Sequence, residues 1–132
     1  IAGFPDESDD DFEESLSFAK KIGFLKIHAF PYSPKRGTPA AAMENQIQNS
    51  VKNERTARLI ELSDIMGDEF IERFKGRNMP VLFEREISEN LYEGYTSNYI
   101  RVIAESKENI QNKILDVKIL SHENDTAHGE II

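Results

Sequence analysis

Hydrophobic residues recur at helical spacing soon after the first residues of the chain. Ser8 is followed by three aspartates, a typical helix start, because the hydroxyl caps unpaired amides and the carboxylates stabilise the positive end of the helix dipole. Apolar residues then follow three or four positions apart from Phe12 to Ile22, and Gly23 is a typical helix stop. The pattern predicts a helix of about 12 to 14 residues.

A short strand and a longer helix are predicted next. Residues 25–30 are largely apolar and alternate, which favours a parallel strand after a crossover helix. Closely spaced prolines predict a loop over residues 31–39. From about Met43 the apolar residues return to helical spacing as far as Gly76. Gly67 weakens this helix midway by about 1 kcal/mol relative to alanine, which allows a bend or a break there.

Beyond Met79 the pattern changes to that of short strands. The apolar and β-branched runs predict strands at residues 81–85, 92–96, 99–104, 114–120 and 129–132. Turn residues separate them, with Gly94 and Ser97-Asn98 among the expected turns. Five short strands in about 50 residues predict a small closed barrel. We therefore expect two domains, an α/β domain over residues 1–76 and an all-β domain over residues 77–132.

Composition adds limits on the kind of protein. The chain has 132 residues, of which 39% are hydrophobic, and it contains no apolar run long enough to cross a membrane and no secretory-type start. We expect a cytoplasmic protein with no membrane partner. The formal charge of −8 argues against a simple nucleic-acid binder, because phosphates are bound mainly by lysine and arginine. Residues 26–58 nevertheless hold a local excess of cations to which RNA can approach: Lys26, Lys35, Arg36, Lys52, Arg55 and Arg58 against Glu44 and Glu54.

Several kinds of chemistry are disfavoured. Ser33 and Thr38 have no histidine and acid partners at a recognisable spacing, so hydrolase chemistry is not expected. The three histidines are too dispersed to indicate a metal site, and the chain has no cysteine. We assign no catalytic residue and no metal ligand.

Three motifs resemble those of the radical S-adenosylmethionine methylthiotransferases. GFPDES at residues 3–8 resembles the family's G-F-P-G-E-T, and FPYSPKRGTPAA at residues 30–41 resembles F-x-Y-S-x-R-x-G-T-x-A-A. GYTSNY at residues 94–99 resembles G-Y-T-x-N-Y in the appended TRAM domain of the threonylcarbamoyl-adenosine branch. The motifs follow the family order and span most of the chain. The resemblance implies the last βα units of a partial TIM-type barrel, followed by a five-stranded TRAM barrel.

The resemblance also implies a function. The full-length enzymes methylthiolate C2 of N6-threonylcarbamoyladenosine at position 37 of tRNA, next to the anticodon, using S-adenosylmethionine and two 4Fe-4S clusters. Those clusters are held by cysteine thiolates, which this chain lacks. We therefore expect a C-terminal fragment that is inactive alone, binds no cofactor by itself, and contributes a cofactor rim and a surface for the anticodon stem-loop of tRNA.

The resemblance assigns the candidate site residues. The expected S-adenosylmethionine rim consists of Gly3, Phe4, Pro5, Glu7, Ser33 and Lys35. The expected RNA contacts are Arg36, Tyr95, Asn98, Tyr99 and Arg101, since aromatic rings stack on unpaired bases and the polar groups bind base edges or phosphates. Lys35 stands where the family has arginine, and Arg36 follows it, so which of the two contacts ligand stays open. Asp6 replaces the family's glycine before Glu7.

Other interpretations stay open beside this one. The rim motif is also typical of an ordinary strand-to-helix turn, and one or both tyrosines of residues 94–99 can pack inside the barrel. The isopentenyl-adenosine branch is an alternative within the family, and a non-enzymatic RNA-binding module is an alternative outside it. Unpaired strand edges also allow a homodimer or a domain swap between copies.

Overall fold

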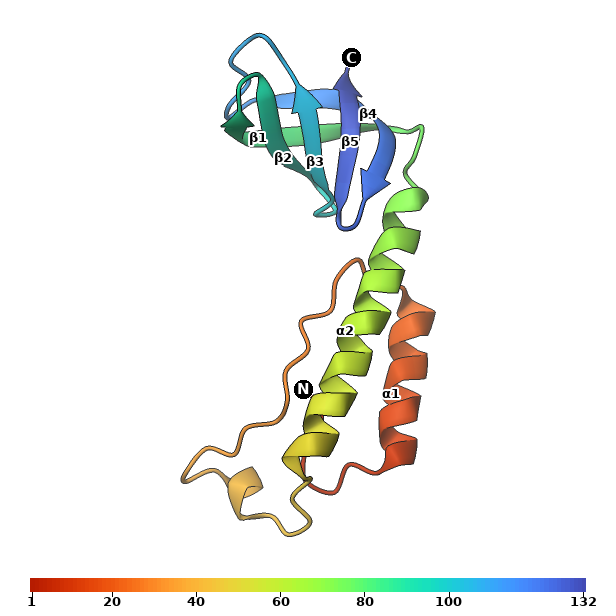
Figure 1. Cartoon of the computed structure of the whole chain (residues 1–132), viewed down its shortest axis with the longest axis vertical. Coiled ribbons are helices and arrows are strands. Elements are labelled where there is room, and N and C mark those ends of the chain that lie inside the picture. Colours follow the sequence, from red (N-terminus) through yellow and green to blue (C-terminus); the bar gives the residue numbers. More distant parts are fainter. The chain divides into compact units, whose positions relative to one another are not determined.

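The computed structural model describes residues 1–132, which form two compact units, Ile1–Met66 and Gly67–Ile132. Figure 1 shows the helices and strands, coloured along the chain. The elements in chain order are α1 (Asp9–Ile22), the short 3-10 helix η1 (Pro39–Ala42), α2 (Asn49–Glu72), β1 (Asn78–Ser88), β2 (Leu91–Thr96), β3 (Arg101–Glu105), β4 (Ile114–Glu123) and β5 (Thr126–Ile131). The division at residues 76 and 77 made from the sequence stays a prediction.

Helix α1 confirms the helix expected after Ser8. The Ser8 hydroxyl accepts a hydrogen bond from the Asp11 amide at 3.1 Å, and the Ser8 amide donates to Asp11 Oδ2 at 2.9 Å, which closes a capping box. At the other end Gly23 has a φ of 70° and donates its amide to the Ala19 carbonyl at 3.1 Å. Local sequence therefore defines both ends of the helix.

The strand predicted at residues 25–30 is wrong. A single parallel bridge joins Ala2 and Pro31: the Ala2 amide donates to the Phe30 carbonyl at 2.9 Å, and the Tyr32 amide donates to the Ala2 carbonyl at 2.8 Å. A strand forms only where a neighbouring backbone accompanies it, and no other residue of the segment has one. The Ile27 amide donates instead to Ser63 Oγ at 2.8 Å. No sheet with βα units therefore forms in this part of the chain.

Helix α2 begins later than the predicted start near Met43. The residues before it form η1, whose first turn is capped by Thr38 Oγ1 accepting from the Ala41 amide at 3.3 Å. The helix continues through Gly67 without the break that this glycine allows, and it ends at Glu72. Gly76 then turns the chain at a φ of 78°. Its amide donates to the Ile119 carbonyl at 2.7 Å, so the predicted stop lies at the entry to the barrel.

The second unit is a closed five-stranded barrel, as the sequence predicts, and its strand order is β1-β2-β3-β5-β4 (Figure 1). Strands β3 and β5 pair in parallel, and the other neighbours pair antiparallel. Alternate residues fill the interior, which includes Val81, Phe83, Tyr92, Val102, Ala104, Val117, Ile119 and Ala127. The closed ladder pairs the backbone of every strand and positions the outward-facing side chains.

Two details of the barrel correct the sequence prediction. Gly94 lies inside β2 and not in a turn. A Cβ there would lie 2.4 Å from the Leu82 carbonyl oxygen of the neighbouring strand, so close approach of the backbones requires glycine. Strand β3 starts at Arg101, because Tyr99 adopts a φ of 66° and belongs to the preceding turn.

Candidate nucleic-acid interface and cofactor rim

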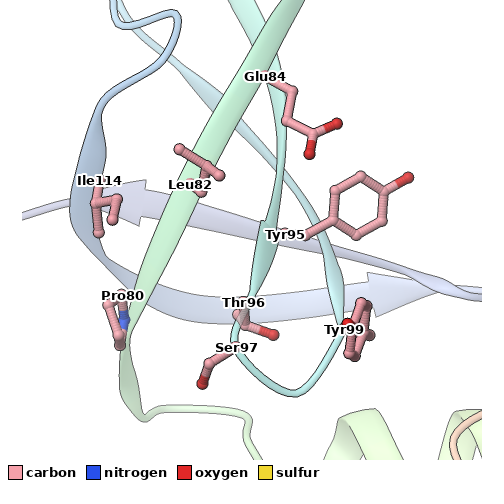
Figure 2. Close-up of a pocket in the computed structure, with 8 residues that line it drawn as sticks. All are labelled: Pro80, Leu82, Glu84, Tyr95, Thr96, Ser97, Tyr99 and Ile114. Atoms are coloured by element: carbon pink, nitrogen blue, oxygen red, sulfur yellow. The ribbon is translucent and has the colours of Figure 1, made fainter.

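A shallow pocket of about 570 Å³ opens on the outer surface of the barrel. Strand β1, the end of β2 with its turn, and the start of β4 line it: Pro80, Leu82, Glu84, Tyr95, Thr96, Ser97, Tyr99 and Ile114. We call it the tyrosine pocket. Figure 2 shows Leu82 and Ile114 on one side and the rings of Tyr95 and Tyr99 on the other.

The pocket is apolar although it faces solvent. Leu82 is 41% exposed, Ile114 67% and Tyr99 80%. Leu82 and Tyr95 are cross-strand partners, so the register of β1 and β2 places an aliphatic and an aromatic side chain next to each other. An exposed apolar cluster with aromatic rings is typical of a binding surface, and it offers flat faces on which a base can stack.

The turn that carries Tyr99 is built around Thr96. Tyr99 donates its amide to the Thr96 carbonyl at 3.0 Å, and Ile100 donates its amide to Thr96 Oγ1 at 2.9 Å. Thr96 Oγ1 donates in turn to Asn98 Oδ1 at 2.6 Å. These bonds hold Tyr99 in a left-handed conformation that a bulky residue rarely adopts. The expected RNA contact Asn98 thus has its carbonyl oxygen engaged in shaping the turn.

Arg101, another expected RNA contact, is paired with a carboxylate that the sequence analysis did not single out. Arg101 Nε donates to Glu93 Oε2 at 2.6 Å, and its Nη2 donates to the same oxygen. Arg85 Nε donates to Glu93 Oε1 at 3.0 Å. Burial alone raises the pKa of Glu93, but the hydrogen bonds and charges of Arg101 and Arg85 outweigh burial and hold that pKa below its ordinary value.

The candidate cofactor rim in the first unit centres on a buried arginine. Arg55 Nη1 donates to Glu7 Oε2 at 2.5 Å and to the Glu7 carbonyl at 3.0 Å, and Arg55 Nη2 donates to Asp9 Oδ1 at 2.7 Å. Burial lowers the pKa of Arg55, but the hydrogen bonds to Asp9 and Glu7 outweigh burial and raise it. Gly3 donates its amide to Glu7 Oε2 at 2.7 Å. This carboxylate therefore ties the Gly3 turn to α2.

Asp6 and Lys35, the two residues of the rim that differ from the family motifs, lie in different surroundings. Asp6 adopts a φ of 67°, the left-handed conformation that favours glycine, and Asp6 Oδ1 accepts from Asn45 Nδ2 at 2.7 Å. The aspartate thus adopts a backbone conformation that glycine tolerates best. Lys35 and Arg36 are both exposed in the loop before η1, where the Lys35 carbonyl accepts from Thr38 Oγ1 at 2.8 Å.

Aromatic contacts connect the two rim segments. The rings of Phe4 and Tyr32 meet edge to face with centroids 5.3 Å apart, and Lys52 Nζ lies 5.1 Å from the Tyr32 centroid. Pro5 is buried, whereas Ser33 is exposed. Tyr32 Oη is buried without a hydrogen-bond partner. The structure thus brings the first rim segment to Tyr32, while the Ser33 and Lys35 side chains face solvent.

The cation excess predicted over residues 26–58 is not a basic surface. Lys52 and Arg55 are only 4% and 5% exposed, and Arg58 pairs with Glu13 at 2.6 Å. Lys26 lies 3.7 Å from Asp64. Helix periodicity places Arg55 and Arg58 of α2 against the acidic start of α1, where Glu7, Asp9 and Glu13 pair with them. RNA cannot reach Lys52 and Arg55 in this structure.

No three acidic, histidine or cysteine side chains gather where they would hold a metal ion, and the chain has no cysteine. Its residues therefore do not fit an iron-sulfur cluster. None of the helices combines the length and the apolar character needed to span a bilayer.

Sequence reasoning missed Arg55 and Glu93 as organising residues. A signal for Arg55 exists, because Lys52, Arg55 and Thr56 share one face of α2 at spacings typical of a buried stripe. Glu93 has a weaker signal. It is the one charged residue of β2 and lies between Tyr92 and Gly94, so only strand pairing identifies the two arginines that accompany it.

No family model matches the chain. Its sequence is nevertheless homologous to tRNA methylthiotransferases over nearly all of its length, which confirms the family resemblance.

Three relatives illustrate the match. The threonylcarbamoyladenosine tRNA methylthiotransferase MtaB of Bacillus subtilis (strain 168) is 41% identical in an alignment of 124 residues, which covers 91% of this chain and 28% of that protein. The tRNA-2-methylthio-N(6)-dimethylallyladenosine synthase of Aquifex aeolicus (strain VF5) is 35% identical over 132 residues, 100% of this chain and 30% of that protein. That of Bacillus cereus (strain B4264) is 34% identical in an alignment of 134 residues, which covers 100% of this chain and 26% of that protein. The chain thus spans less than a third of the length of these relatives.

Proposed function

We propose that this chain is the tRNA-holding part of a tRNA methylthiotransferase, and that its barrel is a TRAM domain. The tyrosine pocket is the observation that carries the proposal, because two tyrosines and an aliphatic wall face solvent on an otherwise acidic molecule. Stacking of one unpaired base on an aromatic side chain is worth about 1 to 3 kcal/mol. Tyr95 and Tyr99 supply such faces for the anticodon stem-loop.

The substrate that we propose is tRNA carrying N6-threonylcarbamoyladenosine at position 37, because MtaB matches at 41% identity. The second candidate is the dimethylallyladenosine branch, whose relatives match over 100% of the chain at 34% and 35% identity. The whole enzyme acts in the cytoplasm and methylthiolates C2 of the modified adenine.

Cofactors enter this proposal only through the complete enzyme. Iron-sulfur clusters need thiolates, and the chain has none, so its residues do not ligate such a cluster. S-adenosylmethionine supplies the methyl group and the radical chemistry in such enzymes. We assign its rim to the turn of Gly3, Phe4 and Pro5 and to the exposed Ser33 and Lys35. Glu7 contributes by fixing that turn through Arg55.

Binding to RNA tests the proposal. The 132-residue chain is titrated with an anticodon stem-loop that carries threonylcarbamoyladenosine, with the dimethylallyladenosine form, and with the unmodified form. We expect the Tyr95→Ala and Tyr99→Ala changes each to weaken binding about tenfold, because each removes one stacking platform. Leu120→Ala, an apolar change on β4 outside the pocket, is the control and leaves binding unchanged.

Each outcome of the titration decides a part of the proposal. Tighter binding of the threonylcarbamoyladenosine form supports the first substrate, and tighter binding of the dimethylallyladenosine form supports the second. Equal losses for the tyrosine variants and the Leu120 control would contradict the role of the pocket. We also propose that copies of this chain pair through unpaired strand edges, as a homodimer or a domain swap. Sedimentation of the same samples measures the mass of the particle and tests this.

A further inference from the structure

We propose that Arg85 and Arg101, oriented by Glu93, form a phosphate-binding pair beside the tyrosine pocket. The ligand is the phosphate of a nucleotide whose base stacks in that pocket, so the inference rests on RNA binding by the barrel. Glu93 is a positioning residue in this arrangement, and it does not contact RNA itself.

Strand register places the pair next to the pocket. Tyr95 is the cross-strand partner of Arg101 on β3 and of Leu82 on β1. Glu93 precedes Tyr95 by two residues and is the partner of Arg85 on β1. Alternate residues of a strand share a face, so Glu93, Tyr95 and their partners lie together on the outside of the barrel. Strands β1, β2 and β3, which carry them, are neighbours in the barrel (Figure 1).

Glu93 holds the two guanidinium groups in fixed orientations. Its side chain is only 4% exposed, whereas those of Arg85 and Arg101 are 65% and 36% exposed. Arg85 contacts Glu93 through Nε and Nη2, both at 3.0 Å, which leaves its Nη1 edge for a ligand. Arg101 is held further by Nη1, which donates to Thr126 Oγ1 at 3.2 Å. The carboxylate is thus covered by the arginines, and the more exposed arginine faces solvent.

The exposed guanidinium donors favour an anion. Glu93, kept ionised by the two arginines, occupies one edge of Arg85 and leaves the Nη1 edge for a ligand, while the Glu84 carboxylate of the pocket lining balances the second positive charge. A purely structural pair needs only one arginine, because an exposed partner such as Arg85 adds little stability. An oriented guanidinium binds phosphate through paired N–H donors and loses little freedom in doing so. The arrangement therefore suits a backbone phosphate next to a stacked base.

The first test removes the exposed arginine. Arg85→Gln in the 132-residue chain is titrated with a single-stranded RNA oligonucleotide over a range of salt concentrations. We expect about tenfold weaker binding at low salt, from the lost charge-assisted hydrogen bonds. The slope of log K against log salt should fall by about 0.7, the value for one phosphate contact on a single strand. Lys118→Gln on β4 is the control, because it removes the same charge from another strand. Its slope of log K against log salt should stay close to that of the unaltered chain.

The second test separates positioning from simple electrostatics. Glu93→Gln removes a negative charge, so nearby charge alone predicts tighter binding of RNA. Positioning predicts the opposite, binding that is weaker by about threefold or more, because the guanidinium groups lose their anchor. The thermal unfolding midpoint of each variant is measured alongside. If Glu93→Gln unfolds the barrel, the Arg85→Gln titration still tests whether the arginine pair binds phosphate.

The outcomes distinguish this inference from the function on which it rests. If the unaltered chain binds no RNA, both fail. If it binds and the tyrosine variants weaken binding, while Arg85→Gln changes neither affinity nor salt slope, RNA binding stands and the phosphate pair is wrong. Tighter binding by a folded Glu93→Gln variant would likewise overturn the positioning role.

Discussion

The barrel and the first unit satisfy their backbone groups in different ways. The closed order β1-β2-β3-β5-β4 pairs every strand with two neighbours. The first unit has one parallel bridge, Ala2 with Pro31, and relies on side chains to fix its loops. Where backbone pairing is sparse, as in the first unit, a charged side chain holds the fold together. Where the backbone is fully paired, as in the barrel, charged side chains are available to shape the surface. Arg55 does the first, and the arginines around Glu93 do the second.

Loss of Arg55 should have the largest effect and be confined to the first unit. Arg55→Met leaves the largely buried Glu7 carboxylate without its partner, which costs about 3 kcal/mol or more. Hydrogen exchange of α1 amides should accelerate while β1 to β5 keep their protection. Arg58→Met is the matched control, because its pair with Glu13 is exposed and contributes about 1 kcal/mol or less. Equal loss of protection in both units would contradict the comparison.

A change at Gly94 should act on the barrel instead. Gly94→Ala forces a Cβ against the Leu82 carbonyl and the Phe83 backbone, a contact that cannot relax without moving a strand. Overpacking of this kind costs about 2 kcal/mol, measured by chemical unfolding followed through the barrel tyrosines. If the denaturant midpoint of Gly94→Ala equals that of the unaltered chain, alanine is tolerated at this position. The close approach of β1 and β2 would then be wrong.

The helix cap should give a smaller and local effect in the first unit. Ser8→Ala removes the hydroxyl that accepts the Asp11 amide, and a lost cap costs about 1 kcal/mol. Ser17→Ala, at an exposed position within α1, serves as the control. Helix content by circular dichroism and exchange at the first turn of α1 measure the difference. A larger loss in the control than in Ser8→Ala would contradict the capping box.

The acid dependence of the barrel should give the smallest effect. The folded-state pKa of Glu93 lies below its unfolded value, so its contribution to stability is present above an ordinary glutamate pKa of about 4.3 and disappears as the pH falls through the lower folded value. Thermal unfolding of the barrel between pH 6 and pH 3 follows this change. In Glu93→Gln the unfolding temperature should fall less steeply between pH 6 and pH 3. An unchanged fall would mean that other carboxylates control the acid dependence.

Local signals made part of the fold predictable. Ser8 and Gly23 define α1 because a cap depends on residues a few positions apart, and alternating apolar runs define the strands because each faces the same interior. The strand at residues 25–30 failed because strand formation depends on a partner elsewhere in the chain. Alternation describes a side-chain pattern, and it does not supply a neighbouring backbone.

The candidate site was predictable to a similar extent. Tyr95 and Tyr99 come from a single motif, and the structure brings them into one pocket. The partners of Arg101 were not predictable, because Arg85 and Glu93 meet it through strand register. The burial of Lys52 was missed for the related reason that a count of charges along the chain does not say which face of a helix they occupy.

Mapping of the RNA contact surface is the most direct test of the central claim, that the tyrosine pocket and the adjoining arginines bind RNA. Backbone amide resonances of the 132-residue chain are followed by NMR during titration with the unmodified anticodon stem-loop. We predict salt-sensitive shifts centred on Tyr95, Tyr99 and Arg101, with little change on α1. Shifts confined to residues 1–66, or no shifts at low salt, would contradict the account.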